Sequence, residues 1–153
     1  MKARMNFFAK APVLLEAMRA LNKAVDESGF ERKLLHLVKL RASQINGCSY
    51  CVDMHVKEAR HDGESEQRLH LVSAWRESPL YSERERAAFE WTEAVTLLPQ
   101  SKAADEFYAP LTTHFSDEEI VQLTMLIGVI NTWNRLCVAF RSQHPVDRQV
   151  EAA

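Results

Sequence analysis

Two cysteines and a histidine lie close together in the sequence, at Cys48, Cys51 and His55. In an α-helix, residues i, i+3 and i+7 lie on one face, so these side chains are predicted to form a single stripe. Gly47 is a plausible break between two helices, which would place both sulfurs in the first turn of the second helix. A helix N-terminus favours a thiolate over a thiol, and His55 can accept the proton of Cys51 or stabilise its charge. The spacing therefore predicts a redox dithiol.

The same spacing permits a disulfide. Residues i and i+3 at the start of a helix have Cα atoms within the range of roughly 4.4–6.8 Å that a disulfide needs. The expected reaction is attack by one thiolate on a peroxide or on another disulfide. Attack on a peroxide produces a sulfenic acid, which condenses with the partner cysteine.

Zinc binding is an alternative for these residues. Cys48, Cys51 and His55 together with His36 would supply four ligands of the types that zinc accepts. Structural zinc sites, however, usually place the C-x-x-C pair on a tight turn and the histidines on a separate element. They also stabilise small domains that lack a core, whereas this chain is long enough to have one. We therefore expect neither a metal nor another cofactor.

The composition indicates one soluble globular domain that spans residues 1–153. Hydrophobic residues make up 46% and charged residues 26% of the 153 positions, which is ordinary for such a protein. A net charge of −2 and a pI near 6.3 argue against binding to nucleic acid or to an anionic membrane. The three cysteines form an odd set, and no signal peptide pattern is present near the N-terminus, so we expect a cytoplasmic protein.

Apolar residues recur at helical spacing along the chain, and no strand-like alternation occurs. The expected fold class is all-α, a bundle of about seven helices in a single domain, with a loose tail after Pro145. Leu37 and Leu40 lie outside the main apolar stripe of the second helix, which predicts burial on more than one side. The predicted helices cover about residues 12–27, 31–45, 48–60, 64–75, 82–98, 103–111 and 117–140.

The last predicted helix is apolar enough to resemble a membrane span. Its internal polar residues would be costly in lipid, so we expect it instead at the centre of the core or in a subunit interface. Cys137 in this helix is predicted to be a core residue. Asn131 and Asn134 could line a pocket or cap a subunit contact, and the second role is favoured. The internal polar residues are Gln122, Asn131, Asn134 and Arg135.

The stretch LVKLRASQINGCSYCVDMH at residues 37–55 resembles the AhpD-like alkylhydroperoxidases of the carboxymuconolactone decarboxylase superfamily. The likeness extends through residues 82–88 and 131–136, and so spans most of the chain, around a C-x-x-C core at about residues 31–61. This resemblance implies an all-helical homo-oligomer, commonly a trimer or a hexamer. It also implies reduction of a peroxide substrate, with Cys51 peroxidatic and Cys48 resolving, and a dithiol or protein reductant as a further partner.

The sequence departs from the redox-active members of that family at one position. Those members carry a glutamate twelve residues before the first cysteine, where it relays protons with the histidine; here that position is His36. An imidazole can carry protons, but it does not supply the negative charge of a carboxylate. We expect His36 to be either a proton relay or a structural or solvated residue. Glu31 and Glu58 are nearby acids, and the sequence gives no geometric reason to prefer either.

The favoured interpretation is an antioxidant thiol peroxidase or a disulfide reductase in which Cys51 is the nucleophile and Cys48 the resolving thiol. His55 is the base, and His36 is a candidate relay. One alternative is a non-catalytic or redox-sensing helical oligomer in which the cysteine pair merely oxidises. Another is an enzyme of the lactone decarboxylase type, which needs no C-x-x-C pair, so the cysteines count against it.

Overall fold

The computed structural model describes residues 2–146, and within this range the chain is helical and contains no strand. The predicted all-α fold is confirmed. The tail predicted to be loose after Pro145 falls mostly outside the described residues. The α-helices are α1 (Pro12–Asp26), α2 (Arg32–Ile45), α3 (Ser49–His61), α4 (Glu66–Leu71), α5 (Glu83–Thr96), α6 (Leu98–Ser101), α7 (Asp105–His114) and α8 (Asp117–Phe140), and there are 3-10 turns at Phe7–Ala9 and Val72–Glu77.

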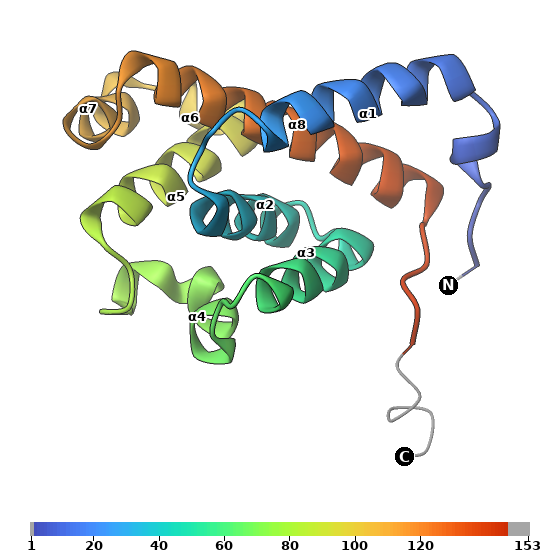
Figure 1. Ribbon diagram of the computed structural model, residues 1–153, viewed down its shortest axis with the longest axis horizontal. Helices are drawn as coiled ribbons and strands as arrows, with labels where there is room; N and C mark the ends of the chain where they lie inside the picture. The colour runs from blue at the N-terminus through green and yellow to red at the C-terminus, as the bar shows by residue number, and fades with distance from the viewer. Residues whose placement is uncertain (1, 147–153) are drawn as a thin grey trace.

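Helix α2 lies in the middle of the molecule, and it packs against α3, α5 and α8 (Figure 1). Every residue from Leu34 to Leu40 is buried, so the predicted burial on more than one side is confirmed. The buried stretch includes His36 and Lys39, two polar residues that need partners inside the protein. This central position makes α2 the support for the cysteine-bearing helix α3.

Helix α8 is the long apolar helix, and it packs against α1, α2 and α5. It starts with a capping box, in which Glu119 N–H donates to Ser116 Oγ at 3.3 Å and Ser116 N–H donates to Glu119 Oε2 at 2.8 Å. By length and hydropathy alone α8 is the one helix among the described residues that could cross a membrane. In this fold Leu123, Ile127 and Ile130 are buried in or beside the core, as expected for a central helix.

The structure differs from the sequence expectation at two helix boundaries and at the N-terminus. The segment expected as one helix over 64–75 is α4 followed by the 3-10 turn Val72–Glu77, and this turn is itself kinked at Ala74, whose φ of −117° and ψ of 28° lie outside the helical region. The segment expected over 82–98 ends at Thr96 and restarts as α6, with Pro99 in the first turn. The 3-10 turn Phe7–Ala9 was not expected, since a three-residue element leaves no periodic signal.

The turn between α2 and α3 fixes the position of the two cysteines. Gly47 has φ +63°, which strains residues with a side chain. Its N–H donates to the Gln44 carbonyl at 3.1 Å, and the Cys48 N–H donates to the Ser43 carbonyl at 3.0 Å. These two bonds form a Schellman motif that ends α2. Cys48 is also the N-cap of α3, where its Sγ accepts a hydrogen bond from the Cys51 N–H at 3.3 Å.

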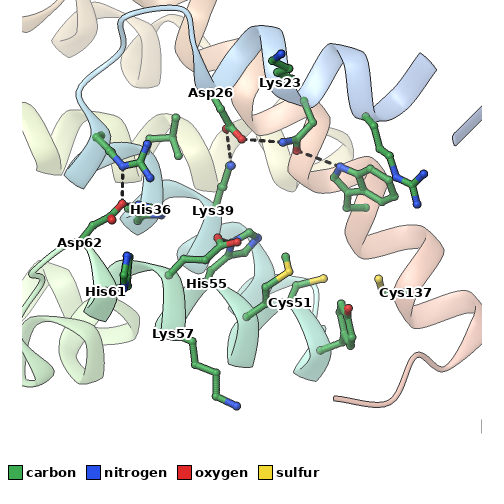
Figure 2. A pocket seen from close by; sticks show the side chains of 18 of the residues that line it. Lys23, Asp26, His36, Lys39, Cys51, His55, Lys57, His61, Asp62 and Cys137 are labelled. Carbon is green, nitrogen blue, oxygen red and sulfur yellow. Dashed lines mark hydrogen bonds and ion pairs between the residues drawn. The ribbon is translucent and has the colours of Figure 1, made fainter. Parts of the chain in front are cut away.

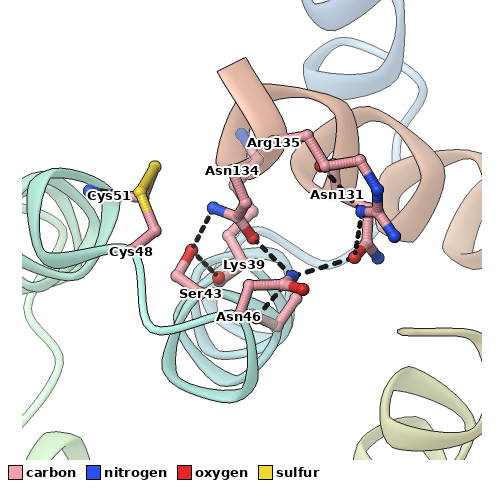
Figure 3. The surroundings of a disulfide bond; sticks show 9 residues. Lys39, Ser43, Asn46, Cys48, Cys51, Asn131, Asn134 and Arg135 are labelled. Atoms are coloured by element: carbon pink, nitrogen blue, oxygen red, sulfur yellow. Dashed lines mark hydrogen bonds between the residues drawn. A yellow bond between two sulfur atoms is a disulfide. The ribbon is translucent and has the colours of Figure 1, made fainter. Parts of the chain in front are cut away.

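Side-chain amides hold this turn against α8 (Figure 3). Asn46 Nδ2 donates to Asn134 Oδ1 and to Asn131 Oδ1, each at 2.9 Å, and Asn134 Nδ2 donates to Ser43 Oγ at 3.0 Å. The favoured prediction that Asn131 and Asn134 cap a subunit contact is therefore wrong. Both side chains are buried and bonded within the chain, because their side of α8 packs against α2. The network ties the cysteine-bearing turn to the helix that carries Cys137.

Candidate active site

Cys48 and Cys51 are joined by a disulfide, as their spacing predicted. Their Cα atoms are 5.4 Å apart, and the two residues are only 2% and 1% exposed. Cys51 lies in the first turn of α3, so both sulfurs are at a helix N-terminus, where the backbone stabilises a thiolate when the pair is reduced.

The two cysteines face different cavities. Cys51 lines a cavity of about 920 Å³ to which α1, α2, α3 and α8 contribute, and this cavity also contains His55 and His36 (Figure 2). Cys48 is absent from its wall and lines a separate cavity of about 390 Å³ beside residues 141–144. The large cavity therefore brings Cys51, His55 and His36 together, whereas Cys48 is reached from elsewhere. Apolar and aromatic residues of the large cavity are Phe8, Leu35, Tyr50, Met54 and Trp133.

His55 is held by an acid on its own helix. Its Nδ1 lies 2.9 Å from Glu58 Oε2, and the ring is only 3% exposed. The hydrogen bond from His55 holds the pKa of Glu58 below its usual value, so the carboxylate is ionised and Nδ1 donates the hydrogen. Burial lowers the pKa of His55, which favours the neutral ring. Its Nε2 is buried and has no hydrogen-bond partner, so its lone pair is free to accept a proton.

His36 repeats this arrangement from helix α2. Its Nε2 lies 2.6 Å from Asp62 Oδ2, and its Nδ1 is buried without a partner. The ring is 6% exposed, so the solvated alternative for His36 is wrong. The reason is the central position of α2, which buries every face of the helix between Leu34 and Leu40. The large cavity thus contains two buried histidines, each with one nitrogen on a carboxylate and the other unpartnered.

Lys39 is a site residue that sequence reasoning missed, and Glu58 is one that it named without choosing it over Glu31. Glu58 contacts His55 at the i, i+3 spacing of a helix, a signal available in the sequence once His55 is placed on α3. Glu31, the other nearby acid, instead pairs with Arg84, whose Nε lies 3.7 Å from Glu31 Oε2. Lys39 is buried and donates from Nζ to Asp26 Oδ1 at 2.6 Å, a contact between two helices that no local spacing reveals.

The third cysteine lies beside the disulfide. The sulfurs of Cys48, Cys51 and Cys137 are all within 4.8 Å of one another, and they form the one such group of potential metal ligands in residues 2–146. His36 and His55 are outside this group, so the four ligands of the zinc alternative are not gathered there. Cys137 is buried in an apolar cluster with Phe7, as the core prediction required, but its sulfur also faces the redox pair.

A family model for carboxymuconolactone decarboxylases matches residues 12–94, more than half of the chain, including Cys48 and Cys51. The chain belongs to the carboxymuconolactone decarboxylase family. The uncharacterized protein YdfG of Bacillus subtilis is 39% identical over 139 residues, which are 91% of this chain and 95% of YdfG. The uncharacterized protein YnjA of Escherichia coli is 38% identical over 96 residues, 62% of this chain and 52% of YnjA.

Solved structures place the chain among the AhpD-like members of the family. A protein from Agrobacterium tumefaciens, described as being of unknown function with a suggested antioxidant role as AhpD, is 55% identical. Its TM-score is 0.94, over 95% of this chain and 100% of that one. The debrominase Bmp8 has a TM-score of 0.83 over 91% of this chain and 75% of its own, and at 24% identity it shows the shared fold alone. The fold is therefore shared with an enzyme that acts as a debrominase.

Proposed function

We propose that this carboxymuconolactone decarboxylase family member is a thiol peroxidase that reduces peroxides through the Cys48–Cys51 disulfide, in antioxidant defence. One observation carries the proposal: Cys51 and the unpartnered Nε2 of His55 line the same cavity. A nucleophile beside a free base is the arrangement that activates a thiol. The apolar and aromatic wall of that cavity suits an alkyl hydroperoxide as well as hydrogen peroxide.

In the proposed reaction the reduced protein loses two electrons to the peroxide. His55 Nε2 takes the proton of Cys51, and the thiolate attacks one peroxide oxygen. The O–O bond breaks, a sulfenic acid forms on Cys51, and the leaving alkoxide or hydroxide takes the proton from His55. Cys48 then attacks the sulfenic sulfur, which releases water and forms the disulfide. A dithiol or protein reductant restores both thiols by exchange.

In this proposal Glu58 is the ionised acid that orients His55 and stabilises its protonated form. It fixes the ring with its hydrogen on Nδ1, and its negative charge stabilises the protonated ring during transfer. His36, at the family's glutamate position, is proposed as a second proton carrier that passes protons between the cavity and Asp62. Glu58 on α3 thereby supplies the carboxylate that is absent at position 36.

The test of the function is a thiol titration combined with a turnover assay. One equivalent of hydrogen peroxide should remove the two thiols of Cys48 and Cys51 and leave Cys137 reduced. With dithiothreitol in excess, the protein should then consume many equivalents of peroxide. If the protein oxidises once and changes its assembly without recycling, the redox-sensing alternative replaces the peroxidase.

The assembly and location of the protein stay predictions. We propose a homo-oligomer, a trimer or a hexamer, located in the cytoplasm. Exposed apolar side chains on α1 and α8, among them Leu14, Val121 and Met125, support the proposed self-association.

Changing Glu58 to glutamine should weaken His55 as a base. The amide can still accept a hydrogen bond from Nδ1, but it no longer supplies the charge that raises the pKa of His55 against the effect of burial. The pKa of His55 should therefore fall further. Because a general base contributes about 10²–10⁴-fold and is only weakened here, peroxide turnover should decrease on the order of 10-fold. The pKa is measured by NMR titration of the histidine rings, independently of activity.

Glu27→Gln provides a matched control, since Glu27 lines the same cavity and pairs with Lys23 rather than with a histidine. It should leave the titration of His55 and the turnover close to wild type. An unchanged pKa of His55 in Glu58→Gln would contradict the assigned role of Glu58.

A further inference from the structure

Cys137 has a position that the proposed peroxidase cycle does not use. It comes from α8, yet its sulfur lies within 4.8 Å of both sulfurs of the disulfide on the other side of the helix interface. It lines the large cavity with Cys51 and the small cavity with Cys48. A free thiol this close to a disulfide is a potential partner for exchange as well as a packing residue.

We propose that Cys137 is a third redox thiol, able to form a disulfide with either Cys48 or Cys51. The inference rests on the redox dithiol of the proposed function, although it does not require a peroxide as the oxidant. It follows from the geometry of three buried sulfurs brought together by two helices.

The exchange step is balanced within the protein. The Cys137 thiolate attacks Cys48 Sγ, a Cys48–Cys137 bond forms, and the Cys48–Cys51 bond breaks. The electron pair leaves on Cys51 Sγ, which takes up the proton that Cys137 lost. One disulfide is present before and after, so no external oxidant or reductant is needed. Cys51 is a good leaving group in this direction because it sits in the first turn of α3 near His55.

Two features make Cys48, and not Cys137, the usual disulfide partner of Cys51. Burial raises the pKa of the Cys137 thiol, so its reactive thiolate is scarce compared with a thiol at a helix N-terminus. The Schellman turn, in contrast, fixes Cys48 directly beside Cys51. Cys137 therefore acts when Cys48 is missing or engaged with a reductant. It then captures oxidised Cys51 before the sulfur can proceed to the irreversible sulfinic acid.

The test uses Cys48→Ser and Cys51→Ser, each treated with diamide, an oxidant that pairs thiols without a peroxide. Non-reducing peptide mass spectrometry should find an intramolecular Cys51–Cys137 disulfide in the first variant and a Cys48–Cys137 disulfide in the second. Each variant should lose two free thiols per chain. The double variant Cys48→Ser/Cys137→Ser should form neither bond, and its Cys51 should reach sulfinic acid under hydrogen peroxide.

The proposal is overturned if both single variants, with wild-type circular dichroism spectra, keep Cys137 reduced while the other cysteine forms intermolecular disulfides. A parallel treatment with hydrogen peroxide separates the two proposals. Crosslinks with diamide but not with peroxide would support the third thiol and contradict the peroxidase. Peroxide turnover by the wild type, without crosslinks in the variants under either oxidant, would contradict the third thiol alone.

Discussion

Replacing Cys51 by serine should abolish peroxide turnover. A serine hydroxyl does not ionise near neutral pH, so the helix N-terminus and the Nε2 of His55 have no thiolate to stabilise. The loss should be on the order of 10⁴-fold or more, as is typical when an enzyme loses its nucleophile. Serine is nearly isosteric with cysteine, so the fold should persist. The measurement is peroxide consumption with dithiothreitol as the reductant, together with a circular dichroism spectrum.

Ser49→Ala is the matched control for this variant. Ser49 lies between the two cysteines in the first turn of α3, but it is exposed and absent from the wall of the large cavity. Its replacement perturbs the same turn without changing a sulfur, and turnover should remain near that of the wild type. Equal turnover by Cys51→Ser and the wild type would remove Cys51 from the reaction.

Replacing His55 by asparagine should lower turnover by about 10²–10⁴-fold, the usual contribution of a general base. Asparagine cannot accept the thiol proton, although its amide can still donate to Glu58. Wild-type activity should persist below pH 6.5, because burial lowers the pKa of His55 and keeps Nε2 unprotonated there. In the variant, the rate should instead rise with pH towards the pKa of the Cys51 thiol. Initial rates from pH 5 to 9 test both expectations.

The same variant has a second readout in its stability. Because the pKa of His55 is lower in the folded protein than in the unfolded chain, the unfolded chain binds more protons in the window just below pH 6.5. The free energy of unfolding of the wild type should therefore decrease as the pH falls through that window. His55→Asn should lose this part of the pH dependence. His36→Asn replaces a second buried histidine of the cavity and leaves His55 in place, so it should retain the part of the pH dependence that belongs to His55.

The sequence predicted the features that depend on local spacing. Cys48, Cys51 and His55 recur with the period of one helix, so their common face could be deduced before any packing was known. The break at Gly47 was also predicted from local sequence, because few residue types adopt a positive φ readily and glycine is one of them. The helical class followed from apolar residues repeated along each segment.

The remaining features depend on which helices meet. The sulfur of Cys137 lies beside the disulfide because α8 packs against α2 and α3, where Asn46 donates to Asn134, and these residues are far apart in the sequence. His36 pairs with Asp62 across α2 and the end of α3, a contact for which the chain has no short-range pattern. Glu58 is the intermediate case, because its spacing from His55 was visible while its selection over other acids required the rotamers of both side chains.

The division of the sulfurs between two cavities has a consequence for the order of events in a catalytic cycle. In a ping-pong enzyme with a single entrance, the second reactant must wait until the first product has vacated it. Here Cys51 opens to the large cavity and Cys48 to the small one. A bulky protein reductant could thus dock at Cys48 without obstructing the chamber in which the oxidant binds, and each half-reaction could evolve its own selectivity.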